Sequence, residues 1–216
     1  MLLTSIWISI VAAIISLDVT ACWQIMISRP IIIGPVIGYL CGDFSHGIIT
    51  GAMLELIWIN TLPLGASIPL DAAATTVVAT ASAIFMERWW TGTEPAAIAI
   101  GLAYALPLGV IFKKLDIFIR RFSNNLVYYA DEYAKEGRML RIQSMVVLAI
   151  ALIVVKYFLF YFISIYCSLY ILHAVVQRLP DTLIAGLDQS WILLIALGLA
   201  MVLDTFMFKK MSKENE

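Results

Sequence analysis

The stretch WQIMISRPIIIGPVIGYLCGD, residues 23–43, is mostly apolar but carries groups that a lipid-facing helix avoids. It holds a glutamine, an arginine, two prolines, three glycines and a terminal aspartate. A helix from Pro30 to Gly42 would rise only about 18 Å, whereas the hydrocarbon core of a bilayer is about 30 Å thick. We therefore expect this segment to enter the membrane and turn back, or to join an interrupted helix.

The composition of the whole chain also points to a membrane. Of its 216 residues, 62% are hydrophobic and 13% are charged, against roughly half and a quarter in soluble domains. The net charge of −1 gives no indication of a nucleic-acid partner. The sequence predicts an all-α integral membrane protein with several transmembrane helices, and with broken or re-entrant segments in its N-terminal half. The apolar runs that predict these helices are Leu2–Leu17, Pro30–Leu40, Ile48–Leu62, Ala72–Met86, Ala96–Phe112, Met145–Leu172 and Trp191–Phe208.

The distribution of charge divides the chain into three parts. Residues 1–112 form a membrane core with interrupted helices, 113–143 a basic amphipathic segment, and 144–216 a pair of transmembrane helices with a tail. Half of the fourteen basic residues lie in Lys113–Arg141, which favours the cytoplasmic side. The segment fits a helix on the inner membrane face or a solvated loop. Lysines in the C-terminal tail place the C-terminus on the same side. Within Met145–Leu172 the only charge is Lys156, which the sequence leaves either paired or reaching toward the headgroups.

Two rows of glycine occupy the N-terminal half at intervals of four residues. The first row is Gly34, Gly38 and Gly42; the second is Gly47 and Gly51, and its next position is Glu55. Such rows lie on one helix face, where they allow another backbone to approach closely. Glu55 then sits at the end of a smooth face, where a small polar solute or a partner backbone could reach it.

The stretch TLPLGASIPLDAAATT, residues 61–76, interrupts the next apolar run with two prolines and a glycine. Irregular backbone at membrane depth is tolerated where it is buried or lines a cavity. Asp71 ends the break, either as the N-cap of the following helix, as a functional carboxylate, or as both. The residues that we expect to bind a neutral polar solute such as a sugar are Gln24, Glu55, Asn60, Ser67 and Asp71, with Trp58 as a flat apolar face.

Other polar residues of this half have structural interpretations. Arg29, fixed by Pro30 behind it, is expected to pair with Asp18 or Asp43 rather than to reach the headgroups. Asp18 itself is interpreted as a helix-end residue. His46 and His173 have no second ligand in register, so we expect no metal site. No nucleotide-binding or hydrolase motif is present, and we expect neither a cofactor nor a catalytic residue.

Residues 15–80 resemble the IIC subunit of bacterial phosphotransferase-system (PTS) permeases of the mannose/fructose/sorbose family. The order and spacing of the matching pieces carry this resemblance. They are Gln24, Ser28–Pro30, Gly34–Pro35, Gly38, Gly42–Asp43, Gly47, Gly51, Glu55–Leu56, Gly65 and Pro69–Asp71. The family's usual double proline before the aspartate is here Pro69-Leu70-Asp71.

The resemblance implies a multi-pass subunit of the bacterial inner membrane that moves a hexose-type sugar inward. It would work with a IID membrane subunit and with soluble IIA and IIB subunits that carry the phosphoryl group, as a hetero-oligomer. In this family pattern Gln24, Glu55 and Asp71 hold sugar hydroxyls. The residues alone leave two alternatives open: an ion-coupled secondary transporter of a small polar solute, and a membrane scaffold that does not transport.

Overall fold

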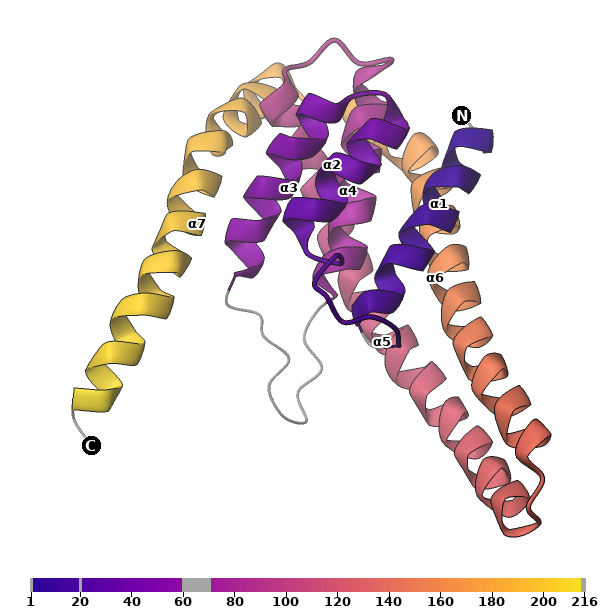
Figure 1. Cartoon of the computed structure of the whole chain (residues 1–216). Helices are drawn as coiled ribbons and strands as arrows, with labels where there is room; N and C mark the ends of the chain where they lie inside the picture. The colour runs from indigo at the N-terminus through magenta and orange to yellow at the C-terminus, as the bar shows by residue number, and fades with distance from the viewer. Residues whose placement is uncertain (1, 20, 60–70, 215–216) are drawn as a thin grey trace.

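The computed structural model describes residues 2–19, 21–59 and 71–214, and in these ranges the chain is helical with no strand (Figure 1). The elements are α1 (Leu2–Ser16), η1 (Leu17–Val19, a 3₁₀ turn), α2 (Pro30–Cys41), α3 (Phe44–Trp58), α4 (Ala72–Glu87), α5 (Glu94–Lys135), α6 (Met139–Val176) and α7 (Asp181–Glu214). Within the described residues, four segments are long and apolar enough to cross a membrane: Leu2–Val19, Glu94–Lys135, Met139–Val176 and Asp181–Asp204. This confirms the expected all-α, multi-pass membrane fold.

The stretch that opens the sequence forms a tight helical hairpin. Pro30 occupies the first turn of α2, and Gly42 ends that helix with a left-handed φ of 88°. Asp43 then caps α3 by accepting a hydrogen bond from the His46 backbone N–H at 2.9 Å. Two short helices therefore lie side by side, and the chain reverses direction after Gly42, which agrees with the expected turn back (Figure 1).

The two glycine rows face each other across this hairpin. A Cβ atom on Gly34 would lie 2.5 Å from the Gly47 carbonyl oxygen, and one on Gly38 would lie 2.6 Å from the Gly47 Cα. Such distances are well below van der Waals contact, so these positions accept only hydrogen as a side chain. The rows are a helix-packing surface.

Helix α4 lies at the centre of the fold. Every residue from Ala73 to Met86 is buried, and the helix packs against α2, α3, α5 and α6. Two of its buried hydroxyls bond within the helix: Thr76 donates to the Ala72 carbonyl at 2.7 Å, and Ser82 donates to the Val78 carbonyl at 2.6 Å. Small side chains thus let four helices approach one axis.

The two longest helices, α5 and α6, form a hairpin that extends beyond the rest of the bundle (Figure 1). Residues 113–135 continue α5 without a break at residue 112, whereas the sequence suggested a separate surface helix or a loop. The hairpin turn at Glu136–Arg138 and the C-terminal end of α7 lie at the same end of the molecule. The α6–α7 turn lies at the opposite end, beside the α4–α5 connection, where Trp89 packs edge-on against His173 at 4.9 Å.

Candidate functional site

Several ends of the short helices meet at one level of the molecule, partway along α5 and α6. These are the C-terminal end of α1, the N-terminal end of α2, the C-terminal end of α3 and the N-terminal end of α4 (Figure 1). Helix ends leave backbone N–H and C=O groups without intrahelical partners, so this level gathers polar groups inside an apolar bundle. Asp18, Arg29, Glu55 and Asp71, which the sequence singled out, lie at or next to these helix ends.

The loop between η1 and α2 is organised by the carboxylate of Asp18, which is only 3% exposed. Its Oδ1 accepts from the Ile25 backbone N–H at 2.8 Å, and its Oδ2 accepts from the Ser28 backbone N–H and hydroxyl at 3.2 and 3.1 Å. Asp18 is therefore more than a helix-end residue, because it fixes the loop that carries Gln24.

The same loop holds three residues other than glycine in left-handed backbone conformations. The φ angles of Trp23, Gln24 and Met26 are 59°, 54° and 66°. Each such residue costs on the order of 1–2 kcal/mol, and such outliers concentrate at functional sites. Gln24 is exposed on this loop, so the strained backbone presents an amide at the level of the helix ends.

Arg29 joins the end of this loop to α3. Its guanidinium pairs with the Glu55 carboxylate, with Nε 2.8 Å from Oε1, and Nη2 also contacts Oε1. The other carboxylate oxygen accepts from the Ile31 backbone N–H at 3.3 Å. The prediction that Arg29 pairs was right, but the expected partners, Asp18 and Asp43, were wrong: Asp18 is occupied by the loop, and Asp43 caps α3 at the far end of the hairpin. Both side chains of the pair stay partly exposed, at 30% for Arg29 and 16% for Glu55.

Asp71 begins α4 and also reaches α6. Its Oδ1 accepts from the Ala74 backbone N–H at 2.9 Å, which confirms the expected N-cap. Its Oδ2 accepts from the hydroxyl of Tyr157 at 3.2 Å. One turn further along α6, the hydroxyl of Tyr161 lies 2.7 Å from that of Ser16 on α1, so α6 ties two of the converging helix ends together.

The remaining predicted binding residues differ in their placement. Trp58 is 7% exposed and belongs to the hydrophobic core, so in this conformation it presents no open face for stacking. Asn60 and Ser67 lie outside the described residues. The sequence missed Tyr157 and Tyr161; their spacing of four residues on an apolar helix was the available signal, since it places both hydroxyls on one face.

Lys156, which the sequence left undecided, is paired. Its ammonium lies 2.6 Å from Asp116 Oδ1 on α5 and sits over the rings of Phe112 and Tyr157 at 5.0 and 4.1 Å. Arg120 donates to the other Asp116 oxygen at 2.7 Å. This buried contact joins the two long helices beside the level at which the helix ends meet.

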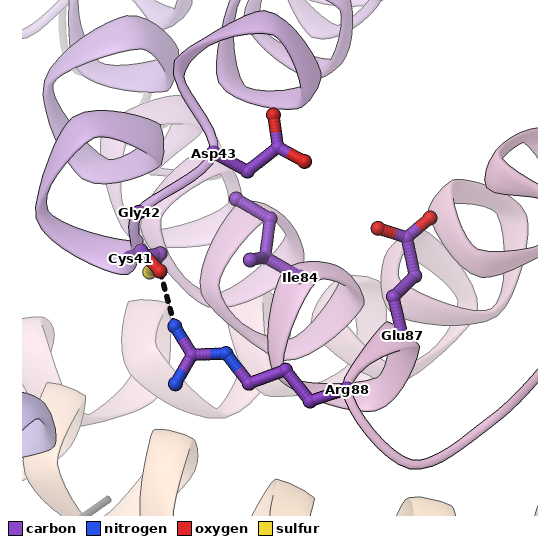
Figure 2. Close-up of a pocket in the computed structure, with 6 residues that line it drawn as sticks. All are labelled: Cys41, Gly42, Asp43, Ile84, Glu87 and Arg88. Carbon is purple, nitrogen blue, oxygen red and sulfur yellow. Dashed lines mark hydrogen bonds between the residues drawn. The ribbon is translucent and has the colours of Figure 1, made fainter.

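A second polar cluster lies at the opposite end of the α2–α3 hairpin. Cys41, Gly42, Asp43, Ile84, Glu87 and Arg88 line a pocket of about 220 Å³ there (Figure 2). The buried imidazole of His46 reaches this cluster, with Nδ1 3.1 Å from Glu87 Oε2. The sequence showed no second ligand in register with His46, and that reason for expecting no metal site does not hold, because the fold brings Glu87 and Glu94, which are distant in sequence, close to His46.

A family profile described as "PTS system sorbose-specific iic component" (EII-Sor) matches residues 2–213. The chain belongs to the EII-Sor family. This agrees with the resemblance read from residues 15–80, and it gives no support to the ion-coupled transporter. The EII-Sor match extends through α5, α6 and α7, where the sequence resemblance was weak.

Curated relatives of this EII-Sor chain are IIC components of sugar permeases. It is 27% identical over 176 residues to the "Fructose permease IIC component" of Bacillus subtilis (strain 168), covering 82% of this chain and 62% of the relative. It is 37% identical over 87 residues to the "Putative N-acetylgalactosamine permease IIC component 2" of Escherichia coli (strain K12), covering 39% of this chain and 62% of the relative. The chain thus spans less than two thirds of the length of these relatives.

Two solved structures share the fold of this EII-Sor chain. "Structure of membrane protein" has a TM-score of 0.71 at 21% identity, over 94% of this chain and 78% of the other. "CryoEM Structure of Mannose Transporter ManYZ and Microcin E492 (MceA) complex" has a TM-score of 0.64 at 22% identity, over 95% and 79%. The arrangement of short and long helices is therefore one that experimentally determined membrane proteins adopt.

Proposed function

We propose that this chain is the sugar-translocating IIC subunit of a PTS permease. It binds a hexose-type sugar between the ends of its short helices and passes it inward, where a soluble IIB subunit phosphorylates it. The chain itself carries no phosphoryl group. The names of its relatives, which refer to permeases for fructose, sorbose, mannose and N-acetylgalactosamine, support hexoses and their derivatives as the substrate class.

The observation that carries this proposal is the partly exposed ion pair between Arg29, at the end of the strained loop, and Glu55 on α3. A sugar hydroxyl both donates and accepts, and this pair offers an acceptor and a donor side by side. Gln24 on the loop adds an amide that does both. Asp71, together with Asn60 and Ser67 from the segment before α4, completes the proposed site. Transporters commonly place a polar substrate at the ends of broken helices near the membrane midplane.

Trp58 would contact the sugar only after a change of conformation. Its ring is buried now, and it would face the sugar once the α2–α3 hairpin moves relative to α4. The glycine rows pack α2 closely against α3, so such a movement would carry the two helices together as one hairpin.

The orientation in the membrane follows from the distribution of basic residues. We place the α5–α6 turn and the C-terminal end of α7 in the cytoplasm of a bacterial cell, and the α6–α7 turn outside. The basic part of 113–143 then faces the cytoplasm, where IIA and IIB act. It is either part of the fixed helical framework or a docking surface for IIB. The IID partner would complete a hetero-oligomer in the same membrane.

Uptake assays test the proposal with matched variants. Cells or right-side-out membrane vesicles that carry the chain with its partner subunits should accumulate labelled hexose, independently of an uncoupler and only with the phosphocarrier chain intact. Glu55→Gln and Asp71→Asn should abolish uptake while the protein remains assembled. Glu132→Gln, an acid exposed on α5, is the control and should keep wild-type uptake.

A charge exchange separates sugar binding from simple stapling of two helices. The double variant Arg29→Glu with Glu55→Arg restores an ion pair, so stability should recover relative to either single variant. Uptake should remain lost, because the acceptor and donor have changed places around the sugar. Recovery of uptake would instead make the pair a structural staple and would overturn the proposed site.

A further inference from the structure

The cluster around His46 lies away from the proposed sugar site, at the end of the bundle where α3 begins and α4 ends. His46 is 1% exposed, and within the described residues neither of its ring nitrogens makes a hydrogen bond. A buried polar group that makes no hydrogen bond costs about 1–3 kcal/mol, so such a group calls for an explanation.

The imidazole is directed toward carboxylates from other elements. Its Nδ1 lies 3.1 Å from Glu87 Oε2 at the C-terminal end of α4 and 3.7 Å from Glu94 Oε1 at the start of α5. Ligand atoms of Asp43, His46 and Glu87 all lie within 4.8 Å of one another. Asp43 uses Oδ1 to cap α3, which leaves Oδ2 available.

Arg88, the cation that lines this pocket, points elsewhere. The Arg88 guanidinium contacts the carbonyl of Cys41 and lies over the Phe85 ring at 5.1 Å, and its side chain extends away from the carboxylates of Asp43 and Glu87 (Figure 2). Three carboxylates therefore surround the imidazole against one guanidinium that is engaged with a carbonyl. The local field favours a cation.

We propose that Asp43, His46 and Glu87 bind a divalent transition-metal ion of the Zn²⁺ class, with a Glu94 oxygen as the fourth ligand. Zn²⁺ binds imidazole nitrogen and carboxylate oxygen at about 2.0–2.2 Å, which puts neighbouring ligand atoms of a tetrahedral site about 3.3 Å apart. The separations from His46 Nδ1 to the two glutamates bracket that value. An imidazole among the ligands favours Zn²⁺ over Mg²⁺ and Ca²⁺, which prefer oxygen alone.

A metal at this position has a structural consequence. Its ligands come from the start of α3, the end of α4 and the start of α5, so the ion fixes the turn of the hairpin to the central helix. The opposite end of the hairpin, with Arg29 and Glu55, is left free to move. The inference rests on the cluster geometry and not on the proposed sugar site.

Zn²⁺ titration of the full chain tests the proposal, with protein purified in detergent without a polyhistidine tag. Isothermal calorimetry should show one Zn²⁺ per chain that excess Mg²⁺ does not displace. His46→Gln, Glu87→Gln and Asp43→Asn should each weaken binding by about ten-fold or more. Asn still caps α3, so the Asp43 variant keeps its fold. His173→Gln, at the other histidine of the chain, is the control and should bind as the wild type does.

Two results would overturn the proposal. The first is wild-type protein that binds no more Zn²⁺ than the His46→Gln/Glu87→Gln double variant. The second is X-ray absorption of the Zn²⁺-loaded wild type that shows a sulfur ligand, which would assign the ion to Cys41. One imidazole nitrogen with oxygen ligands supports the proposal, and this measurement holds even where a variant fails to fold.

Discussion

The ammonium of Lys156 lies 2.6 Å from the carboxylate of Asp116, and this buried contact joins α6 to α5. The two partners are not equivalent. Lys156 is 5% exposed and has Asp116 as its ion-pair partner among the described residues, whereas Asp116 also pairs with Arg120.

This asymmetry predicts unequal costs of substitution. Asp116→Asn leaves a buried ammonium without a counter-charge and should destabilise the protein by about 3 kcal/mol. Lys156→Met should cost clearly less, because Arg120 still neutralises Asp116, and the double variant should recover part of the loss. Thermal unfolding in detergent measures all three. Asp131→Asn, in an exposed pair with Lys135, is the control and should unfold like the wild type.

The glycine contact of the α2–α3 hairpin predicts a second pair of results. Gly47→Ala places a methyl group 2.5 Å from the Gly34 carbonyl oxygen and should destabilise the protein by about 3 kcal/mol. Gly186→Ala on α7 meets no atom within 4 Å and should be neutral or stabilising by up to about 1 kcal/mol. Equal unfolding temperatures for the two variants would contradict the close packing of the hairpin.

The strained loop predicts a gain of stability on substitution. Met26 is exposed and has a φ of 66°, so Met26→Gly should raise the free energy of unfolding by roughly 0.5–1 kcal/mol. Met26→Val should lower it, since a β-branched residue tolerates this conformation worst. Chemical denaturation in mixed micelles compares the two variants, and losses of similar size in both would argue against left-handed backbone at this position.

Asp71 has two hydrogen-bonding roles that substitutions can separate. Tyr157→Phe removes only the contact with α6 and should cost about 1 kcal/mol. Asp71→Ala removes that contact and the N-cap of α4, and should cost about 2 kcal/mol. The double variant should cost less than the sum of the two single variants, because once Asp71 is alanine the Tyr157 hydroxyl has no hydrogen bond left for Tyr157→Phe to remove.

The proposed orientation predicts which turns react from outside the cell. In a variant that lacks Cys22, Cys41 and Cys167, single cysteines are introduced as Gln177→Cys near the α6–α7 turn and Glu136→Cys at the α5–α6 turn. A thiol reagent that cannot cross the membrane should label the first in intact spheroplasts and the second only in inverted vesicles. Labelling of Glu136→Cys in intact spheroplasts, and of Gln177→Cys only in inverted vesicles, would show that the topology is the opposite of the one proposed.

The sequence predicted the helices well because their signals are local. Apolar runs mark α1, α4 and α6, Pro30 marks the start of α2, and Gly42 with Asp43 marks the turn into α3. The length of the Pro30–Gly42 segment indicated either a turn back or an interrupted helix, and the structure has the turn back. By contrast, nothing in the residues around 112 could show that α5 continues, because an amphipathic pattern is the same whether a helix is separate or continuous.

The partners of polar residues could not be predicted, since they depend on which helices become neighbours. For Arg29 the sequence offered Asp18 and Asp43, whereas the structure pairs it with Glu55, which is further along the chain, and places Asp43 at the other end of the hairpin. His46 seemed isolated because Glu87 comes from another helix 41 residues later. The binding roles of Gln24, Glu55 and Asp71 remain predictions, and the uptake assays described above test those of Glu55 and Asp71.

The complete enclosure of α4 has a consequence for biogenesis. A sixteen-residue helix of alanine, threonine and other small residues gains little from lipid and is too short to cross the bilayer alone. It cannot remain as an independent span while the ribosome is still producing α5 and α6, which form much of its surroundings. The segment must therefore wait near the membrane surface or inside the insertion machinery, and it takes its place only after later parts of the chain arrive. Co-translational insertion of this protein is thus completed out of sequence order, from the outside of the bundle to its axis.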